Sequence, residues 1–292
     1  MTLPGDSMTK PIMFDAPREN EFTQGTVFSC AYAEDYPETP SYGLVITARC
    51  DAAQGKAPIL SYIPVVPLND WMLCDGASIA MERIHADCLN TLRNHLKDAS
   101  LSESLLETKT VDEIYDSHFR PKEAEKAWAA RCVKIRASMD TFIRNQQVWA
   151  PSGSREERRL HLIANATKAE AVLKELTGNR LNGFYLLRHM PLLSGAEANS
   201  VALLREIHHI PTKLAREIVG GLTKDDWTAR CDPAVRCPRF VAFDDLAAPV
   251  AKLRSPWIEH VMQNFTMLFA RIGVTDNDFA EVRQSLSTIG LG

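Results

Sequence analysis

Residues 43–71 read GLVITARCDAAQGKAPILSYIPVVPLNDW, and this stretch decides the fold. Gly43–Ala48 is a continuous apolar run, rich in β-branched residues and too short for a helix, which predicts a buried strand. The polar segment 52–58 predicts a turn, and Ile59–Leu68 predicts a second strand. The stretch therefore predicts two neighbouring buried strands with a sharp polar stop between them.

A third strand is predicted at residues 22–31, which alternate around a glycine. Pro64 and Pro67 confine the strand that contains them to an edge or a bulge, because proline cannot donate a ladder hydrogen bond. Together these strands predict a first β unit over 21–75. Residues 1–20 are polar and aperiodic, and we expect a flexible arm there.

The middle of the chain has the periodicity of helices. We expect short helices over 76–120, among which Thr110 and Glu113 have the spacing of a capping box, and a helical hairpin over 121–178. Apolar residues recur at spacings of 4, 3, 4 and 3 in two successive helices, namely Trp128, Cys132, Ile135, Met139 and Phe142, and then Leu162, Ala166, Ala169, Leu173 and Leu176. This spacing is typical of a coiled-coil-like seam, and the short connector 150–154 predicts an antiparallel pair.

Strand patterns return in a second β unit over 179–255, and residues 256–292 predict C-terminal helices. The five residues 47–51, TARCD, recur letter for letter at 228–232. Either the two β units are duplicates, or both contribute strands to one sheet with the helical arm inserted between them. In both cases the fold class is α+β, with small SH3-like β-barrel units, an inserted antiparallel coiled-coil-like helical hairpin and C-terminal helices.

The composition is that of an ordinary globular protein, with 45% hydrophobic and 24% charged residues. The formal net charge of −4 does not indicate a nucleic-acid or membrane-surface protein as a whole. Seven cysteines form no close-spaced framework, and there is neither a secretory leader nor an apolar run of 18 residues. These features predict a cytoplasmic protein that does not bind membranes.

Positive charge is concentrated in the helical arm. Residues 120–180 contain 13 Lys and Arg against 7 Asp and Glu, a net of +6, so the remainder carries −10. The candidate binding residues gather where the hairpin turns: Arg144, Trp149, Arg155, Arg158 and Arg159. They predict a basic surface for nucleic acid or an acidic partner, although a solvated helical face with internal ion pairs explains the same pattern.

The candidate catalytic group lies at the end of the first buried strand and just beyond it. It consists of four residues, namely Thr47, Arg49, Cys50 and Asp51. Arg49 would lower the pKa of a reactive thiol at Cys50. The structural alternative is an Asx turn at Asp51 beside a small core cysteine. We expect no metal and no cofactor, because the cysteines and histidines lack zinc-site spacing and no nucleotide-loop, metalloprotease or hydrolase motif is present.

Three segments, QGTVF at 24–28, YGLVIT at 42–47 and IPVVPL at 63–68, together resemble the small β-barrel of the MazF/PemK toxin superfamily. That resemblance covers about 50 residues and implies an SH3-like barrel and endoribonuclease activity. Tyr42-Gly43 stands where the family has Arg-Pro, so the arginine used in RNA cleavage has no counterpart there. Thr47 and Arg49 would have to substitute for it.

Two further stretches resemble uncharacterised bacterial proteins of mobile or defence-associated gene clusters. They are VITARCD at 45–51 and KLRSPWIEHVMQNFTMLFARIG at 252–273. This resemblance implies a genetic context rather than a chemistry.

The leading functional hypothesis is a non-enzymatic protein-interaction or regulatory component of a bacterial defence or toxin–antitoxin-like system. Its partner would be another protein encoded nearby, and a second copy of the chain is a further candidate. One alternative is a MazF/PemK-like endoribonuclease that uses Thr47, Arg49 and Asp51. The other is nucleic-acid binding through the basic arm.

Overall fold

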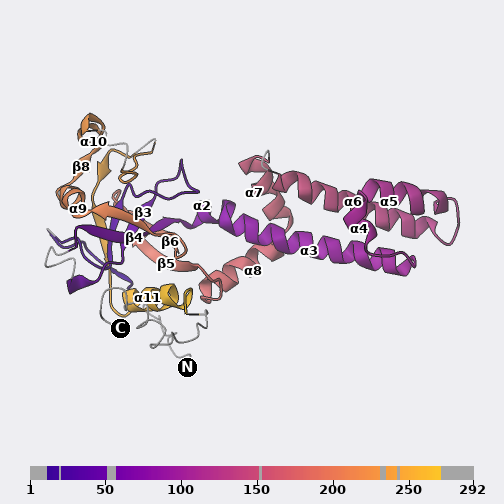
Figure 1. Cartoon of the computed structure of the whole chain (residues 1–292), viewed down its shortest axis with the longest axis horizontal. Helices are drawn as coiled ribbons and strands as arrows, with labels where there is room; N and C mark the ends of the chain where they lie inside the picture. The colour runs from indigo at the N-terminus through magenta and orange to yellow at the C-terminus, as the bar shows by residue number, and fades with distance from the viewer. Residues whose placement is uncertain are drawn as a thin grey trace, which may run out of the picture.

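The computed structural model describes residues 12–19, 21–50, 57–150, 153–230, 235–241 and 244–270. An antiparallel sheet at one end of the molecule carries a long helical arm (Figure 1). The strands are β1 (Phe14–Asp15), β2 (Thr26–Ser29), β3 (Tyr42–Val45), β4 (Ile59–Pro67), β5 (Phe184–Pro191), β6 (Glu197–Leu203), β7 (His208–Pro211), β8 (Leu222–Thr223), β9 (Leu246–Ala247) and β10 (Pro249–Leu253).

The helices lie mostly between the two groups of strands. They are α2 (Leu68–Leu73), α3 (Asp75–Asp98), α4 (Leu105–Thr108), α5 (Val111–His118), the 3₁₀ helix η1 (Arg120–Lys122), α6 (Ala129–Trp149), α7 (Arg155–Ala164), α8 (Ala166–Thr177), α9 (Thr212–Val219), α10 (Lys224–Arg230) and α11 (Trp257–Met267).

Strands from both halves of the chain join one sheet, in the order β1-β10-β2-β3-β4-β6-β5, with β7 also pairing with β4. The edges approach one another, since the Arg188 amide on β5 donates to Met13 Sδ beside β1 at 3.3 Å. The result is a nearly closed, barrel-like antiparallel sheet. Of the two arrangements that the sequence leaves open, the structure has the single sheet with the arm inserted.

Gly43 illustrates how closely the strands of this sheet pack. It pairs with Pro64 across β3 and β4. A Cβ at this position would lie 2.3 Å from the Phe28 ring and 2.9 Å from the Tyr62 ring. Only glycine therefore allows these two aromatic side chains to pack over the strand, edge to face with their centroids 5.2 Å apart.

The barrel interior is filled by apolar side chains that alternate along the strands. It includes Val27, Leu44, Ile63, Val65, Tyr185, Leu187, Ala202, Ala251 and Leu253, and α11 adds Ile258 and Val261. A second cluster lies between the sheet and α9, and a third lies between the sheet and α2, α3 and α8. The apolar side chains of the sheet are thus buried either in the barrel interior or beneath the helices that pack on the sheet.

The arm differs from the hairpin expected over 121–178. The periodic residues of α6 are buried against α3 and α5, while Leu162 and Leu176 pack against Ala77 and Ala80 of α3. The second predicted helix is also divided at Asn165 into α7 and α8. The two seams therefore pack in tandem along α3 rather than on each other.

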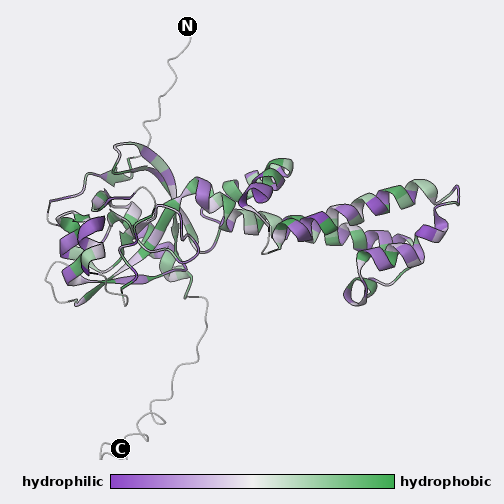
Figure 2. Ribbon diagram, turned by 90° about the horizontal axis from the view of Figure 1, so that it is seen from above, coloured by the Kyte–Doolittle hydropathy of each residue, from purple (hydrophilic) through white to green (hydrophobic). Residues whose placement is uncertain are grey.

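The length of α3 explains this arrangement. It has 24 residues, with buried positions from Ala77 to Leu96, so it presents an apolar stripe about 30 Å long. One short partner helix cannot cover that stripe. Figure 2 shows hydrophobic and hydrophilic residues alternating along the helices of the arm.

The repeated pentapeptide TARCD does not mark equivalent positions. Thr47 follows β3, and its hydroxyl accepts a hydrogen bond from the Ser61 amide at 2.7 Å. Thr228 lies inside α10, where its hydroxyl donates to the Lys224 carbonyl at 2.8 Å. Asp51, Cys231 and Asp232 lie outside the described residues. The two copies therefore have different local structures where both are described.

Candidate protein-binding surface

The predicted binding residues lie where the arm leaves the barrel, not at its far end. Helix α7 folds back over α2, because Arg155 donates to the Asp70 carboxylate. The distal end is formed instead by α4, α5 and the start of α6 (Figure 1). The expected projecting basic tip is thus a waist between the two parts of the molecule. We call the exposed side chains Arg144, Trp149, Leu160 and Ile163, together with the half-buried Arg158, the waist surface.

Two of the predicted arginines are neutralised locally. Arg155 pairs with Asp70, and Arg159 donates to both carboxylate oxygens of Glu156 at 2.8 and 2.6 Å. Arg144 and Arg158 have no carboxylate partner within the described part of the chain. Burial and the nearby Arg144 charge lower the pKa of His161, so this imidazole is neutral at pH 7. The waist surface therefore carries two cations available to a partner.

Trp149 borders a cavity of about 440 Å³ between α3 and the end of α6. Glu82, His85, Gln146 and Ala150 complete its lining, and the His85 ring lies 5.0 Å from the Phe142 ring beneath it. Trp149 is 37% exposed. A partly exposed tryptophan beside an apolar hollow is typical of a protein-binding anchor.

Helix α7 adds two apolar side chains that are even more exposed. Leu160 is 53% and Ile163 is 60% exposed. They are three residues apart, so they share the outer face of α7. Leu162 between them points inward and is buried. The outer face of α7 therefore carries two apolar side chains that do not contribute to the core.

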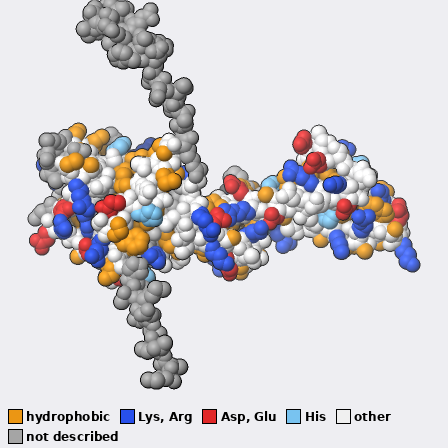
Figure 3. Space-filling model, turned by 90° about the horizontal axis from the view of Figure 1, so that it is seen from below, with side chains coloured by type: hydrophobic (Ala, Val, Ile, Leu, Met, Phe, Trp, Pro, Cys, Tyr) orange, Lys and Arg blue, Asp and Glu red, His pale blue; other side chains and the backbone are white. Residues whose placement is uncertain are grey.

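Six further cations of the arm have carboxylate partners. The pairs are Arg83–Glu175, Arg93–Glu103, Arg120–Asp116, Arg131–Asp98, Arg136 with both Asp112 and Asp140, and Lys168–Asp87. Figure 3 shows the two signs of charge mixed along one face of the arm. Part of the positive charge counted from the sequence is thus held in ion pairs with carboxylates.

The candidate catalytic residues lie at one end of the barrel. Thr47 uses its hydroxyl oxygen to fasten β3 to β4, as described above. Arg49 and Cys50 are exposed just beyond β3, and Asp51 lies outside the described residues. The structure therefore assigns Thr47 a structural contact, and it does not show the four residues assembled as one group.

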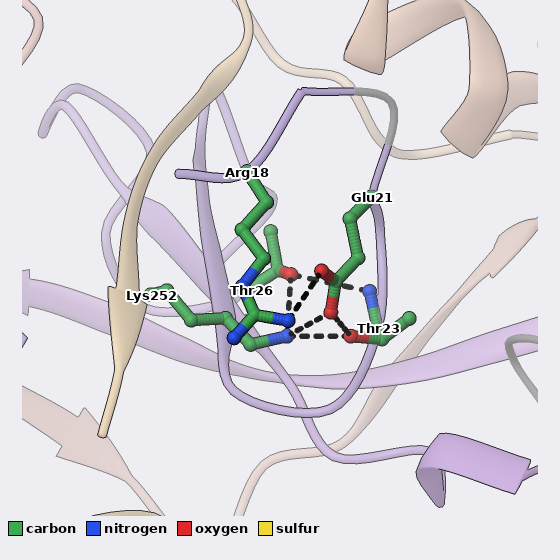
Figure 4. Close-up of polar contacts among 5 residues, drawn as sticks. All are labelled: Arg18, Glu21, Thr23, Thr26 and Lys252. Carbon is green, nitrogen blue, oxygen red and sulfur yellow. Dashed lines mark hydrogen bonds and ion pairs between the residues drawn. The ribbon is translucent and has the colours of Figure 1, made fainter. Parts of the chain in front are cut away.

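Lys252 on β10 is the most notable polar residue near this end (Figure 4). It is only 8% exposed. Its ammonium donates to Glu21 at 3.0 Å, to the Thr23 hydroxyl, and to the Thr26 hydroxyl at 3.5 Å. All three N–H groups are thus used, and the loop before β2 is fastened to β10.

The protonation states fit this structural role. The hydrogen bond from the Thr23 hydroxyl, reinforced by Lys252 and Arg18, lowers the pKa of Glu21 to about 2. Burial lowers the pKa of Lys252, and Glu21 opposes that shift. Because its donors are already satisfied, Lys252 has none left for a ligand.

The sequence did not predict the Lys252 cluster or the α3 side of the cavity beside Trp149. Lys252 is a single cation within the apolar strand PVAKL at 249–253, and such a residue signals a buried ion pair. His85 and Glu82 could be found only by recognising that α3 is the common partner of α6 and α8. Within the described ranges, no group of three or more His, Cys, Asp or Glu side chains is placed to hold a metal ion.

Comparison with known proteins found no similar protein. No protein-family model, curated protein or solved structure matches the chain. None of the helices described here is long and apolar enough to cross a membrane.

Proposed function

We propose that the protein is a non-enzymatic interaction or regulatory component whose waist surface binds another protein. In this proposal an SH3-like barrel holds a coiled-coil-like arm, and the system is a bacterial defence or toxin–antitoxin-like system whose neighbouring genes encode the partner. The partner segment is acidic and amphipathic. Its apolar side chains contact Trp149, Leu160 and Ile163, and its carboxylates pair with Arg144 and Arg158.

The observation that carries the proposal is a contrast within the arm. Several of its cations are paired with carboxylates, whereas Trp149, Leu160 and Ile163 are apolar and exposed. Aromatic and aliphatic anchors beside a hollow favour protein recognition. Two unpaired arginines at the rim would select an acidic partner by charge complementarity.

Nucleic-acid binding through the arm is the less favoured alternative. That affinity depends on cations that displace counterions from phosphates. On this arm a phosphate would have to compete with Asp112, Asp140, Asp87 and Glu175 for the cations that they already hold. The pairs reduce the field that a duplex or single strand would meet.

The endoribonuclease alternative has less support still. The Thr47 hydroxyl already accepts a hydrogen bond from the Ser61 amide. Among the described residues at this end of the barrel, no side chain that could act as a general base pairs with Arg49. The family's Arg-Pro step is also replaced by Tyr42-Gly43. We therefore give the barrel a scaffolding role in the proposal.

The test is a quantitative binding assay between the full chain and the products of its adjacent genes. Trp149→Ala, and separately the double change Leu160→Ser with Ile163→Ser, should weaken the complex by about tenfold or more. Val133→Ser is the matched control, because Val133 is 70% exposed on the same helix as Trp149 and outside the waist surface. Equal affinity in all three variants and the parent would refute the assigned surface.

A further inference from the structure

A second cavity in the described residues lies away from the waist surface. It occupies about 670 Å³ between the turn from α8 to β5 and the end of α11. Figure 1 shows these two elements side by side below the barrel. This volume is within the range of small-molecule sites.

The charge of the cavity wall is one-sided. Arg180 and Arg205 line it, and none of the described lining residues is a carboxylate. Two guanidinium groups facing one hollow favour a ligand with an anionic group, and their planar geometry suits phosphate.

Arg205 is held in place before any ligand binds. It donates to the Asn182 carbonyl at 2.9 Å, and its guanidinium lies 5.6 Å from the centre of the Phe184 ring. Its side chain runs across Gly183, where a Cβ would lie 2.2 Å from its Nε and where φ is +92°. The glycine therefore leaves room for the arginine, which reduces the entropy lost on binding an anion.

Carboxamides supply uncharged hydrogen-bonding groups in the same wall. Asn179, Asn182 and Asn264 all line the cavity. The amide nitrogen of Asn264 donates to the His260 carbonyl at 2.8 Å, so its oxygen remains an acceptor. The side chains of Asn179 and Asn182 have no hydrogen-bond partner in the part of the chain that is described. These groups suit the edge of a heterocycle.

The rim of the cavity is apolar and includes an aromatic ring. Met267 is 55% and Phe269 is 58% exposed at the end of α11. A planar heterocycle can stack on such a ring. The cavity thus combines cations, carboxamides and an aromatic surface within one hollow.

We propose that this cavity binds a mononucleotide. Arg180 and Arg205 contact its phosphates, the asparagines contact the edge of its base, and Phe269 with Met267 packs on the base. This binding site is separate from the waist surface, so it stands or fails independently of the protein-interaction function.

Isothermal titration calorimetry of the full chain with ATP, GTP, adenosine and inorganic tripolyphosphate tests the proposal. We expect at least one of the two nucleotides to bind, and adenosine and tripolyphosphate each to bind at least about tenfold more weakly than that nucleotide. Arg180→Gln should weaken nucleotide binding by about tenfold or more. Arg216→Gln is the control, since Arg216 is exposed on α9, remote from the cavity lining.

Arg205→Gln provides a second variant, and a thermal melt shows whether it remains folded. Asn264→Asp provides a third, because it removes a carboxamide that contacts the edge of the base and adds a negative charge to the cavity wall without disturbing Gly183. Absence of heat with both nucleotides at about 1 mM, a range in which even weak ligands bind, would overturn the proposal. It would also be overturned if Arg180→Gln and Asn264→Asp bound as tightly as Arg216→Gln.

Discussion

The barrel and the arm are stabilised by contacts of very different range. In the barrel, the Ser29 hydroxyl donates to the Leu246 carbonyl at 3.0 Å across 217 residues of sequence, and β10 pairs with β2. The arm is continuous from α2 to α8, and its distal core is made by residues between Leu92 and Phe142. Pairing the strands of the barrel therefore costs the conformational entropy of closing a long loop. The arm avoids most of that cost, because its contacts join residues that are closer in sequence.

The two regions also treat charge differently. The barrel buries a lysine and satisfies all its donors, as Lys252 shows. The arm leaves its charges in exposed pairs, which contribute little to stability individually. The barrel is thus the region in which polar substitutions should matter most, and the arm is the region in which surface residues are available for binding.

Trp71 should give the largest effect, because it joins the two regions. It is fully buried, and its ring packs edge to face on Phe184 with centroids 5.3 Å apart. Trp71→Ala should lower the free energy of unfolding by about 3–5 kcal/mol. Urea denaturation followed by far-UV circular dichroism measures this, with Val133→Ala as the control, because Val133 is 70% exposed and we expect a change within about 0.5 kcal/mol there. Similar losses for the two variants would contradict the assigned packing.

The arm core provides the next test. Leu92 is 1% exposed among the side chains that α3, α5 and α6 share. Leu92→Ala should lower the free energy of unfolding of the arm by about 2–5 kcal/mol. Because the contacts of the arm are local, its helices should unfold at a lower denaturant concentration than the barrel. Hydrogen exchange should then rise in α5 and α6 while β2 to β4 stay protected. Equal loss of protection in the barrel would show that the two regions unfold as one unit.

Glu21 tests the buried charge cluster of the barrel through pH. Its folded pKa of about 2 is below the ordinary value, so the ionised carboxylate stabilises the fold above the unfolded pKa of about 4.3, and that contribution disappears as pH falls through about 2. Glu21→Gln should therefore cost on the order of 1–2 kcal/mol at pH 7.

The difference in stability between Glu21→Gln and the parent should shrink steadily from pH 4.3 to about 2, because the Glu21 carboxyl of the unfolded parent chain is protonated in this range while that of the folded chain stays ionised. Denaturant midpoints recorded at several pH values measure it. Glu19→Gln is the control, because Glu19 is an exposed glutamate two residues earlier. If the difference in stability between Glu21→Gln and the parent stayed the same down to pH 2, the ionised carboxylate would not be the cause of that difference.

The smallest effect is expected at the N-terminus of α5. Thr110 accepts the Glu113 amide at 3.2 Å, and Glu113 accepts the Thr110 amide at 2.8 Å, which completes a capping box. Thr110→Ala should cost about 1 kcal/mol. Thr141→Ala is the control, since its hydroxyl bonds only to the Ala137 carbonyl within α6. A thermal melt that ranks the two variants equally would contradict the capping role.

The sequence predicted local features well. The strands around residues 43–48 and 59–68, the capping box at Thr110 and the buried periodicity of Cys132, Ile135 and Met139 are all confirmed. Each depends on neighbouring residues, through a strand period of 2, a helix period of 3.6 or a side chain that bonds three residues away. The mixed helix and sheet class followed from these features.

Contacts between distant segments were the part that local patterns could not supply. The seam of α6 looks the same whether it packs on α7 or on α3, so the tandem packing and the waist position of Trp149 were not predicted. Strand β7 was missed because HHIP is short and half polar. The cavity beside α11 joins residues near 180, 205 and 265, and no sequence period links them.

The most direct test of the central claim is purification of the tagged chain expressed together with its adjacent genes, by size-exclusion chromatography with absorbance at 260 and 280 nm. The account predicts a stoichiometric protein partner, a spectrum of protein alone, and loss of that partner in Trp149→Ala but not in Val133→Ser. Co-purifying nucleic acid that high salt removes, with no protein partner dependent on Trp149, would contradict it.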